Sequence, residues 1–118
     1  MYDIIIDADK KLRKSAAAWK ERLKTSSRMP YPRLVVEAEE YVEQASGFHV
    51  GGTPLCHRLM LHGGDMGVLH GIVDSPHNIV EYFVEIRLGQ DEYGNLSYSF
   101  PNEPLAKEYT ISRTFNVK

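Results

Sequence analysis

The sequence predicts an α+β domain in which an N-terminal helical hairpin packs on a four- to five-stranded antiparallel sheet. Two apolar stripes with helical spacing come first, and segments of alternating apolar and polar residues follow them. Strands that succeed one another without intervening helices favour an antiparallel sheet over repeated βαβ units. The length of 118 residues suits one domain, so we treat residues 1–118 as a single α+β domain.

The clearest strand pattern lies between Val80 and Leu88. Every second residue there is apolar, and the residues between them are charged except for Phe83. Successive side chains of a strand point to opposite faces, so this segment predicts one buried and one polar face. The polar residues 90–95 predict a turn, and the alternation resumes in residues 96–100. Together these segments predict an antiparallel hairpin.

Two helices are predicted upstream of this hairpin. From Lys10 to about Thr25, apolar residues recur with the spacing of one helical stripe, and Asp7 or Asp9 would cap the start. A second helix is expected to begin at Pro32 and to stop at Gly47. It has a broad apolar face and an acidic face, whereas the first helix is basic. The simplest arrangement of the two is an αα-hairpin.

The remaining segments predict further strands. Residues 2–6 alternate and form either a short edge strand or a lead-in to the core. Residues 55–62 and 66–73 read as two strands joined by a Gly-Gly turn. After a proline-containing loop at 101–108, a last strand is expected at 109–117.

The composition fits an ordinary globular protein. Hydrophobic residues make up 42% and charged residues 25% of the chain, values typical of globular domains. The single cysteine allows no internal disulfide and favours a reducing compartment. There is no signal-peptide pattern, and no apolar run approaches the roughly 20 residues of a membrane span. We therefore expect a soluble, cytoplasmic protein without a membrane partner.

The charges are unevenly distributed, which provides one functional alternative. Residues 1–33 hold nine Lys and Arg against four acidic residues, and the rest of the chain holds five against twelve. A basic segment can bind nucleic acid through phosphate contacts. The candidate residues on the first helix are Lys10, Arg13, Lys14, Lys20 and Lys24. The pI near 6.2 lies below that of domains that bind nucleic acid by charge, so this hypothesis ranks second.

The histidines provide another alternative. All five lie within residues 49–77, and imidazole is a common zinc ligand. The candidate ligands are His57, His62, His70 and His77. No established zinc-binding spacing accompanies them, and strand histidines are more often surface or hydrogen-bonded residues. Our primary expectation is therefore a protein without a cofactor, with a divalent metal such as zinc as the alternative.

No catalytic motif emerges from the sequence. Cys56 and His57 are adjacent, but neighbours on a strand point to opposite faces and cannot form a catalytic pair. The chain contains no G-x-S-x-G motif, and its glycine pairs lack the GK[ST] ending of a P-loop. We therefore predict that the protein is not an enzyme.

A protein-binding role best fits a well-patterned fold without an active-site motif. Phe83 is the only apolar residue on the otherwise polar face of its strand, and it would form an anchor with a polar rim. The predicted partner-binding residues are Phe83, Glu81, Glu85 and Arg87. The last strand, if it lies at the sheet edge, could pair with a second copy to form a homodimer.

We therefore expect a small non-catalytic binding module that acts through protein–protein contacts. Compact domains without an active-site motif often serve as regulators or inhibitors. Phage-type anti-defence proteins are one example of that class.

Overall fold

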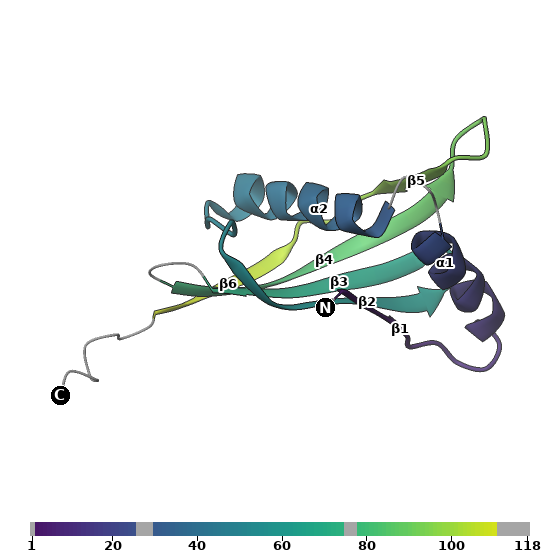
Figure 1. The fold of residues 1–118 in the computed structure, drawn as a ribbon, viewed down its shortest axis with the longest axis horizontal. Helices are drawn as coiled ribbons and strands as arrows, with labels where there is room; N and C mark the ends of the chain where they lie inside the picture. Colours follow the sequence, from purple (N-terminus) through teal and green to yellow (C-terminus); the bar gives the residue numbers. More distant parts are fainter. Residues whose placement is uncertain (1, 26–29, 75–77, 111–118) are drawn as a thin grey trace.

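The structure is a computed structural model that describes residues 2–25, 30–74 and 78–110. Two helices lie on one face of a six-stranded sheet (Figure 1), which confirms the predicted α+β class. In chain order the elements are β1 (Tyr2–Ile6), α1 (Arg13–Thr25), α2 (Pro30–Ser46), β2 (Thr53–Gly63), β3 (Met66–Asp74), β4 (Asn78–Gln90), β5 (Leu96–Ser99) and β6 (Leu105–Thr110).

The sheet is mixed and mostly antiparallel. Strands β2, β3, β4 and β5 form a meander in which each pairs antiparallel with the next. The short β1 pairs parallel with β2, and β6 pairs antiparallel with the first half of β4. The sheet thus has six strands, against the four or five predicted, and one of its strand pairs is parallel. The period of two in residues 2–6 indicated a strand, but it did not indicate which strand β1 would pair with or in which direction.

Strand β4 confirms the predicted two-faced pattern. Val80, Tyr82, Val84, Ile86 and Leu88 are buried and belong to the core. The turn after β4 is also as predicted. Gly94 has a φ of 84°, which glycine adopts without steric cost, and the Asp91 carboxylate accepts the backbone N–H groups of Tyr93 and Asn95.

Several predicted boundaries were wrong. Helix α1 begins at Arg13 rather than Lys10, because residues 10–12 form a turn in which the Leu12 N–H donates to the carbonyl of Asp9. Helix α2 begins at Pro30 rather than Pro32. Residues 105–108 belong to β6 and not to a loop, because they pair with β4. Residues 111–117 of the predicted last strand lie outside the described residues.

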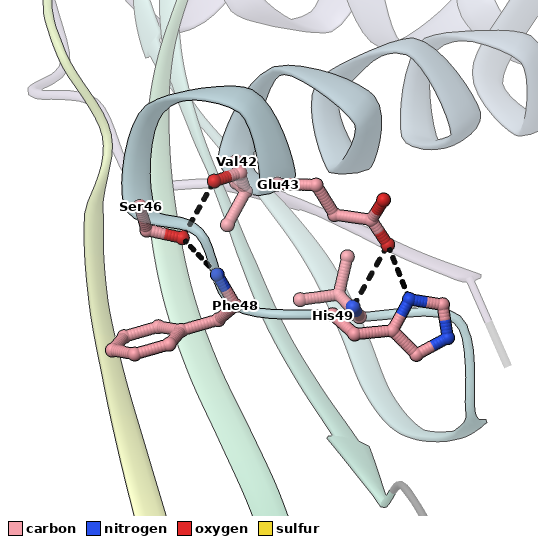
Figure 2. Close-up of polar contacts among 6 residues, drawn as sticks. Val42, Glu43, Ser46, Phe48 and His49 are labelled. Atoms are coloured by element: carbon pink, nitrogen blue, oxygen red, sulfur yellow. Dashed lines mark hydrogen bonds and ion pairs between the residues drawn. The ribbon is translucent and has the colours of Figure 1, made fainter.

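The end of α2 is fixed by side-chain hydrogen bonds (Figure 2). The Ser46 hydroxyl donates to the carbonyl of Val42 at 2.6 Å and accepts the N–H of Phe48 at 3.1 Å. The Glu43 carboxylate accepts the N–H of Val50 at 2.9 Å and lies 3.2 Å from Nδ1 of His49. Gly47, with a φ of 81°, occupies the predicted stop position. These contacts direct the chain from α2 into β2.

The helices cover different strands of the same sheet face. Helix α1 packs on β1 and β2, and α2 packs on β4 and β6. A carboxylate on α2 binds the sheet directly, because Glu39 Oε2 accepts the Tyr82 hydroxyl at 2.7 Å and lies 2.8 Å from Nε2 of His57. The side chains of Tyr82 and His57 are almost fully buried. We call this helix-covered side the inner face. In the described part of the chain, no helix is long and apolar enough to cross a membrane.

Candidate functional site on the outer face of the sheet

The opposite side of the sheet, which we call the outer face, carries no helix among the described residues (Figure 1). Its side chains belong to strand positions that alternate with the core positions. The apolar residues of this face come from five strands and include Ile5, Met60, Val68, Ile72, Phe83 and Leu105. Ile5 is 39% and Leu105 72% exposed, and the other four are half-buried.

The composition of the outer face is unusual for a surface in water. An antiparallel sheet with one solvated face normally shows apolar residues inside and polar residues outside. Strand β3 departs from this rule, since Val68 and Ile72 stand on its outer side and Leu69 and Val73 on its inner side. An apolar surface rimmed by polar residues is typical of an interaction site. The outer face is therefore the candidate functional site.

The centre of this face is built from side chains of three strands. The rings of His70 on β3 and Phe83 on β4 stack in parallel, with centroids 4.3 Å apart and planes 2° apart. His70 Nε2 lies 2.7 Å from a carboxylate oxygen of Glu81. The hydroxyl of Tyr109 on β6 donates to the other oxygen of Glu81 at 3.1 Å. The contacts hold these four side chains in defined positions.

The Glu81 carboxylate is stabilised in its charged form. The hydrogen bond from His70 lowers the pKa of Glu81 below its ordinary value, and the bond from Tyr109 and the positive charge of Lys107 act in the same direction. Partial burial opposes them but does not outweigh them. The outer face thus has an anionic group near its centre, next to the His70–Phe83 stack.

Several charged residues of the outer face form no ion pair within the described part of the chain. They include Asp3 on β1, Arg58 on β2 and Lys107 on β6. The Nε atom of Arg58 is also buried without a hydrogen-bond acceptor among the described residues. Buried guanidinium groups are normally satisfied. Arg58 stands beside Asp3, and Lys107 beside Glu81, in the strand registers, so each cation has an acid on the neighbouring strand without forming an ion pair with it.

All four predicted partner-binding residues stand on the outer face. Glu81 and Phe83 lie at its centre, and Phe83 is stacked on His70 rather than isolated as the sequence suggested. Glu85 is exposed and accepts a hydrogen bond from Asn102. Arg87 lies near the end of β4, 3.9 Å from Asp65. The partner-binding prediction missed Arg58, Val68 and Ile72, whose outward positions follow from alternation in β2 and β3, and the sequence analysis named His70 only as a candidate metal ligand.

The histidines proposed as metal ligands are not gathered in one place. His57 is on the inner face, His70 is on the outer face, and His62 lies near Asp7 at the end of β2. His77 is outside the described residues. Within the ranges that the structure describes, no three His, Cys, Asp or Glu side chains are grouped to hold a metal ion. The zinc hypothesis gains no support from this geometry.

The residues of the nucleic-acid hypothesis lie on or next to α1. Lys10, Arg13, Lys14 and Lys24 are exposed, and Lys20 is half-buried. Trp19 packs against the core and donates a hydrogen bond to the carbonyl of Gly64 at 2.9 Å. It is therefore not a free platform for base stacking. Nucleic-acid binding by α1 stays a prediction.

Comparison of the chain with protein-family models, with curated proteins and with solved structures finds no match.

Proposed function

We propose that this protein is a small, non-catalytic binding module that acts through protein–protein contacts made by the outer face of its sheet. The observation that carries the proposal is the group of apolar side chains on the central strands β2, β3 and β4, on the side of the sheet opposite the helices: Met60, Val68, Ile72 and Phe83. Water is a poor environment for these side chains, and covering them with a partner gains hydrophobic free energy.

The arrangement of the outer face resembles that of known protein interfaces. Its centre holds an aromatic ring, Phe83, stacked on His70, and charged groups such as Glu85 and Lys107 lie around it. Interfaces commonly combine an apolar and aromatic centre with a polar rim. The fixed positions of His70, Phe83 and Glu81 also reduce the side-chain entropy that a partner must remove on binding.

Within this proposal, the protein is a regulator or inhibitor that works by occupying a surface of its partner. The cytoplasm is its proposed compartment, because a single cysteine suits a reducing environment. Homodimer formation is part of the same proposal.

Site-specific photocrosslinking in living cells tests the proposal. A benzophenone amino acid replaces Leu105, which is 72% exposed beside Phe83 on the outer face. The same amino acid replaces Val36, which is 57% exposed on α2, as the matched control. We expect a crosslinked protein product from position 105 and none from position 36.

A second change ties the product to the outer face. Phe83→Lys should abolish the product from position 105, because it places a charge in the apolar centre. Circular dichroism would establish that this variant remains folded. Equal products from positions 105 and 36, or none from either, would contradict the proposed function.

A further inference from the structure

We infer that the protein partner of the outer face is a second copy of this chain, stacked sheet on sheet about a twofold axis that runs along β3. This inference rests on the proposed function and specifies the partner. The resulting dimer would have four layers, with both sheets in the middle and both helical layers outside. Every apolar sheet face would then be covered.

The strand order makes β3 the natural position of the axis. Where β6 pairs with β4, the order across the sheet is β1-β2-β3-β4-β6, and β3 is the central strand. A twofold axis along β3 places β2 of one copy over β4 of the other and β1 over β6. Val68 and Ile72 stand on β3, so each would meet its own counterpart at the axis.

The charges of the outer face complement one another in this arrangement. Arg58 on β2 would stand level with Phe83 on β4 of the other copy, between Glu81 and Glu85, which lie one outward position to either side. Asp3 on β1 would stand level with Leu105 on β6 of the other copy, one outward position from Lys107. Arg58, Asp3 and Lys107 form no ion pair among the described residues. A second copy would place a further opposite charge across from each of them.

The alternative in-plane axis is electrostatically unfavourable. A twofold axis perpendicular to the strands would place each strand over the same strand of the other copy. Arg58 would then face a β2 that also carries Arg58, and Glu81 and Glu85 would face each other across β4. Like charges at an interface disfavour that register. The charges thus select the axis along β3.

The outer face is large enough for a stable contact. Five strands about 4.8 Å apart, and outward positions about 6.6 Å apart along them, give a flat footprint of about 600 Å². The relief of the side chains increases this area. Stable interfaces bury about 800 Å² on each partner, so the face has the required order of size.

Exchanging charges between subunits tests the dimer. Purified wild-type protein at about 100 µM should sediment as a dimer, at a concentration well above a micromolar dissociation constant. Arg58→Glu and Glu85→Arg should each weaken the dimer about tenfold or more, because each places like charges across the axis twice. Mixing these two variants should restore dimers, because a mixed pair has opposite charges at both positions.

Two further variants separate electrostatics from folding. The double variant Arg58→Glu with Glu85→Arg should form homodimers again, because the two charges are exchanged within one chain. If a single variant failed to dimerise because it had lost its fold, mixing it with the other single variant would not restore the dimer. Val36→Lys, on the exposed side of α2, should leave the dimer unchanged. Circular dichroism of each variant records the helix content.

The outcomes distinguish this inference from the proposed function. A wild-type chain that stays monomeric, or a dimer that both single variants leave intact, overturns the twofold stacking on β3. In the second case the contact would lie elsewhere, for example at the β6 edge. A monomer that still crosslinks from position 105 to a different protein would leave the proposed function standing. A monomer that gives no crosslink contradicts both.

Discussion

Tyr82 owes its buried position to a glycine on the neighbouring strand. Gly71 stands beside Tyr82 in the β3–β4 register and beside His57 in the β2–β3 register. A Cβ atom on Gly71 would lie 2.2 Å from Cζ of Tyr82, so the tyrosine ring occupies the space that a larger residue would fill. The ring can therefore extend its hydroxyl to Glu39 on α2. One small residue thus permits the polar link between sheet and helix.

The first prediction concerns this glycine. Gly71→Ala should lower the free energy of unfolding by about 1–3 kcal/mol, because the added methyl group must displace a fully buried ring. Urea unfolding followed by circular dichroism measures the change. Gly89→Ala is the matched control on β4, since its Cβ would meet only Oγ of Ser97 at 3.4 Å. Equal effects of the two substitutions would contradict the role assigned to Gly71.

The second prediction concerns the pH dependence of Glu81. The hydrogen bond from His70 lowers the pKa of Glu81 in the folded chain, so the unfolded chain binds the proton more readily. The stabilisation is therefore complete above the unfolded pKa and is lost as the pH falls through the folded pKa.

Urea unfolding between about pH 7 and about pH 3 measures this effect. Glu81→Gln should flatten the decline of stability toward acid pH, because the titrating group is removed. Glu103→Gln changes an exposed carboxylate in the loop between β5 and β6 and should keep the wild-type slope. An identical slope in Glu81→Gln and wild-type protein would refute the assignment.

Helix α1 is attached to the sheet at the turn between β2 and β3. Trp19 Nε1 donates to the carbonyl of Gly64 at 2.9 Å, and the N–H of Gly64 donates to the Ser15 hydroxyl at 2.9 Å. A Cβ on Gly63 would lie 2.3 Å from Cβ of Leu12, in the turn that precedes α1. The close approach of α1 to this turn therefore requires glycine at position 63.

The third prediction compares the two glycines of this turn. Both have positive φ, 97° for Gly63 and 60° for Gly64, so alanine at either position costs about 1 kcal/mol of backbone strain. Only Gly63→Ala also collides with Leu12, and it should cost a further 1–3 kcal/mol or so. It should also shift the fluorescence of Trp19 in the folded protein, whereas Gly64→Ala should not. Similar spectra and similar stabilities would argue against this attachment.

The molecule as a whole has one continuous core. Its buried residues come from both helices and from the sheet, and include Leu23 of α1, Val42 of α2, Leu69 of β3 and Ile86 of β4. Each element buries its apolar side against the same cluster, so none has an independent core. Such an arrangement favours cooperative unfolding.

The fourth prediction follows from this shared core. Trp19 fluorescence reports on α1, whereas far-ultraviolet circular dichroism reports on all helices and strands. The two signals should give the same urea midpoint at a fixed protein concentration, because α1 unfolds together with the sheet. A Trp19 transition at clearly lower urea would show that α1 unfolds separately.

The outer face was only partly predictable from the sequence. Phe83 with its acidic neighbours was recognisable, because an apolar residue out of pattern is visible within one strand. Arg58 and Lys107 were not recognisable as parts of the same surface. They lie on β2 and β6, far apart in the sequence, and only strand pairing brings them onto one face.

By itself, the sequence determined the local features of this protein. The two helical stripes, the two faces of β4 and the stop at Gly47 follow from side-chain spacing and backbone preference, which act over a few residues. The tertiary structure decided that β1 pairs parallel with β2 and that β6 joins β4. Backbone hydrogen bonds are chemically alike in every strand, so only long-range packing could select these neighbours.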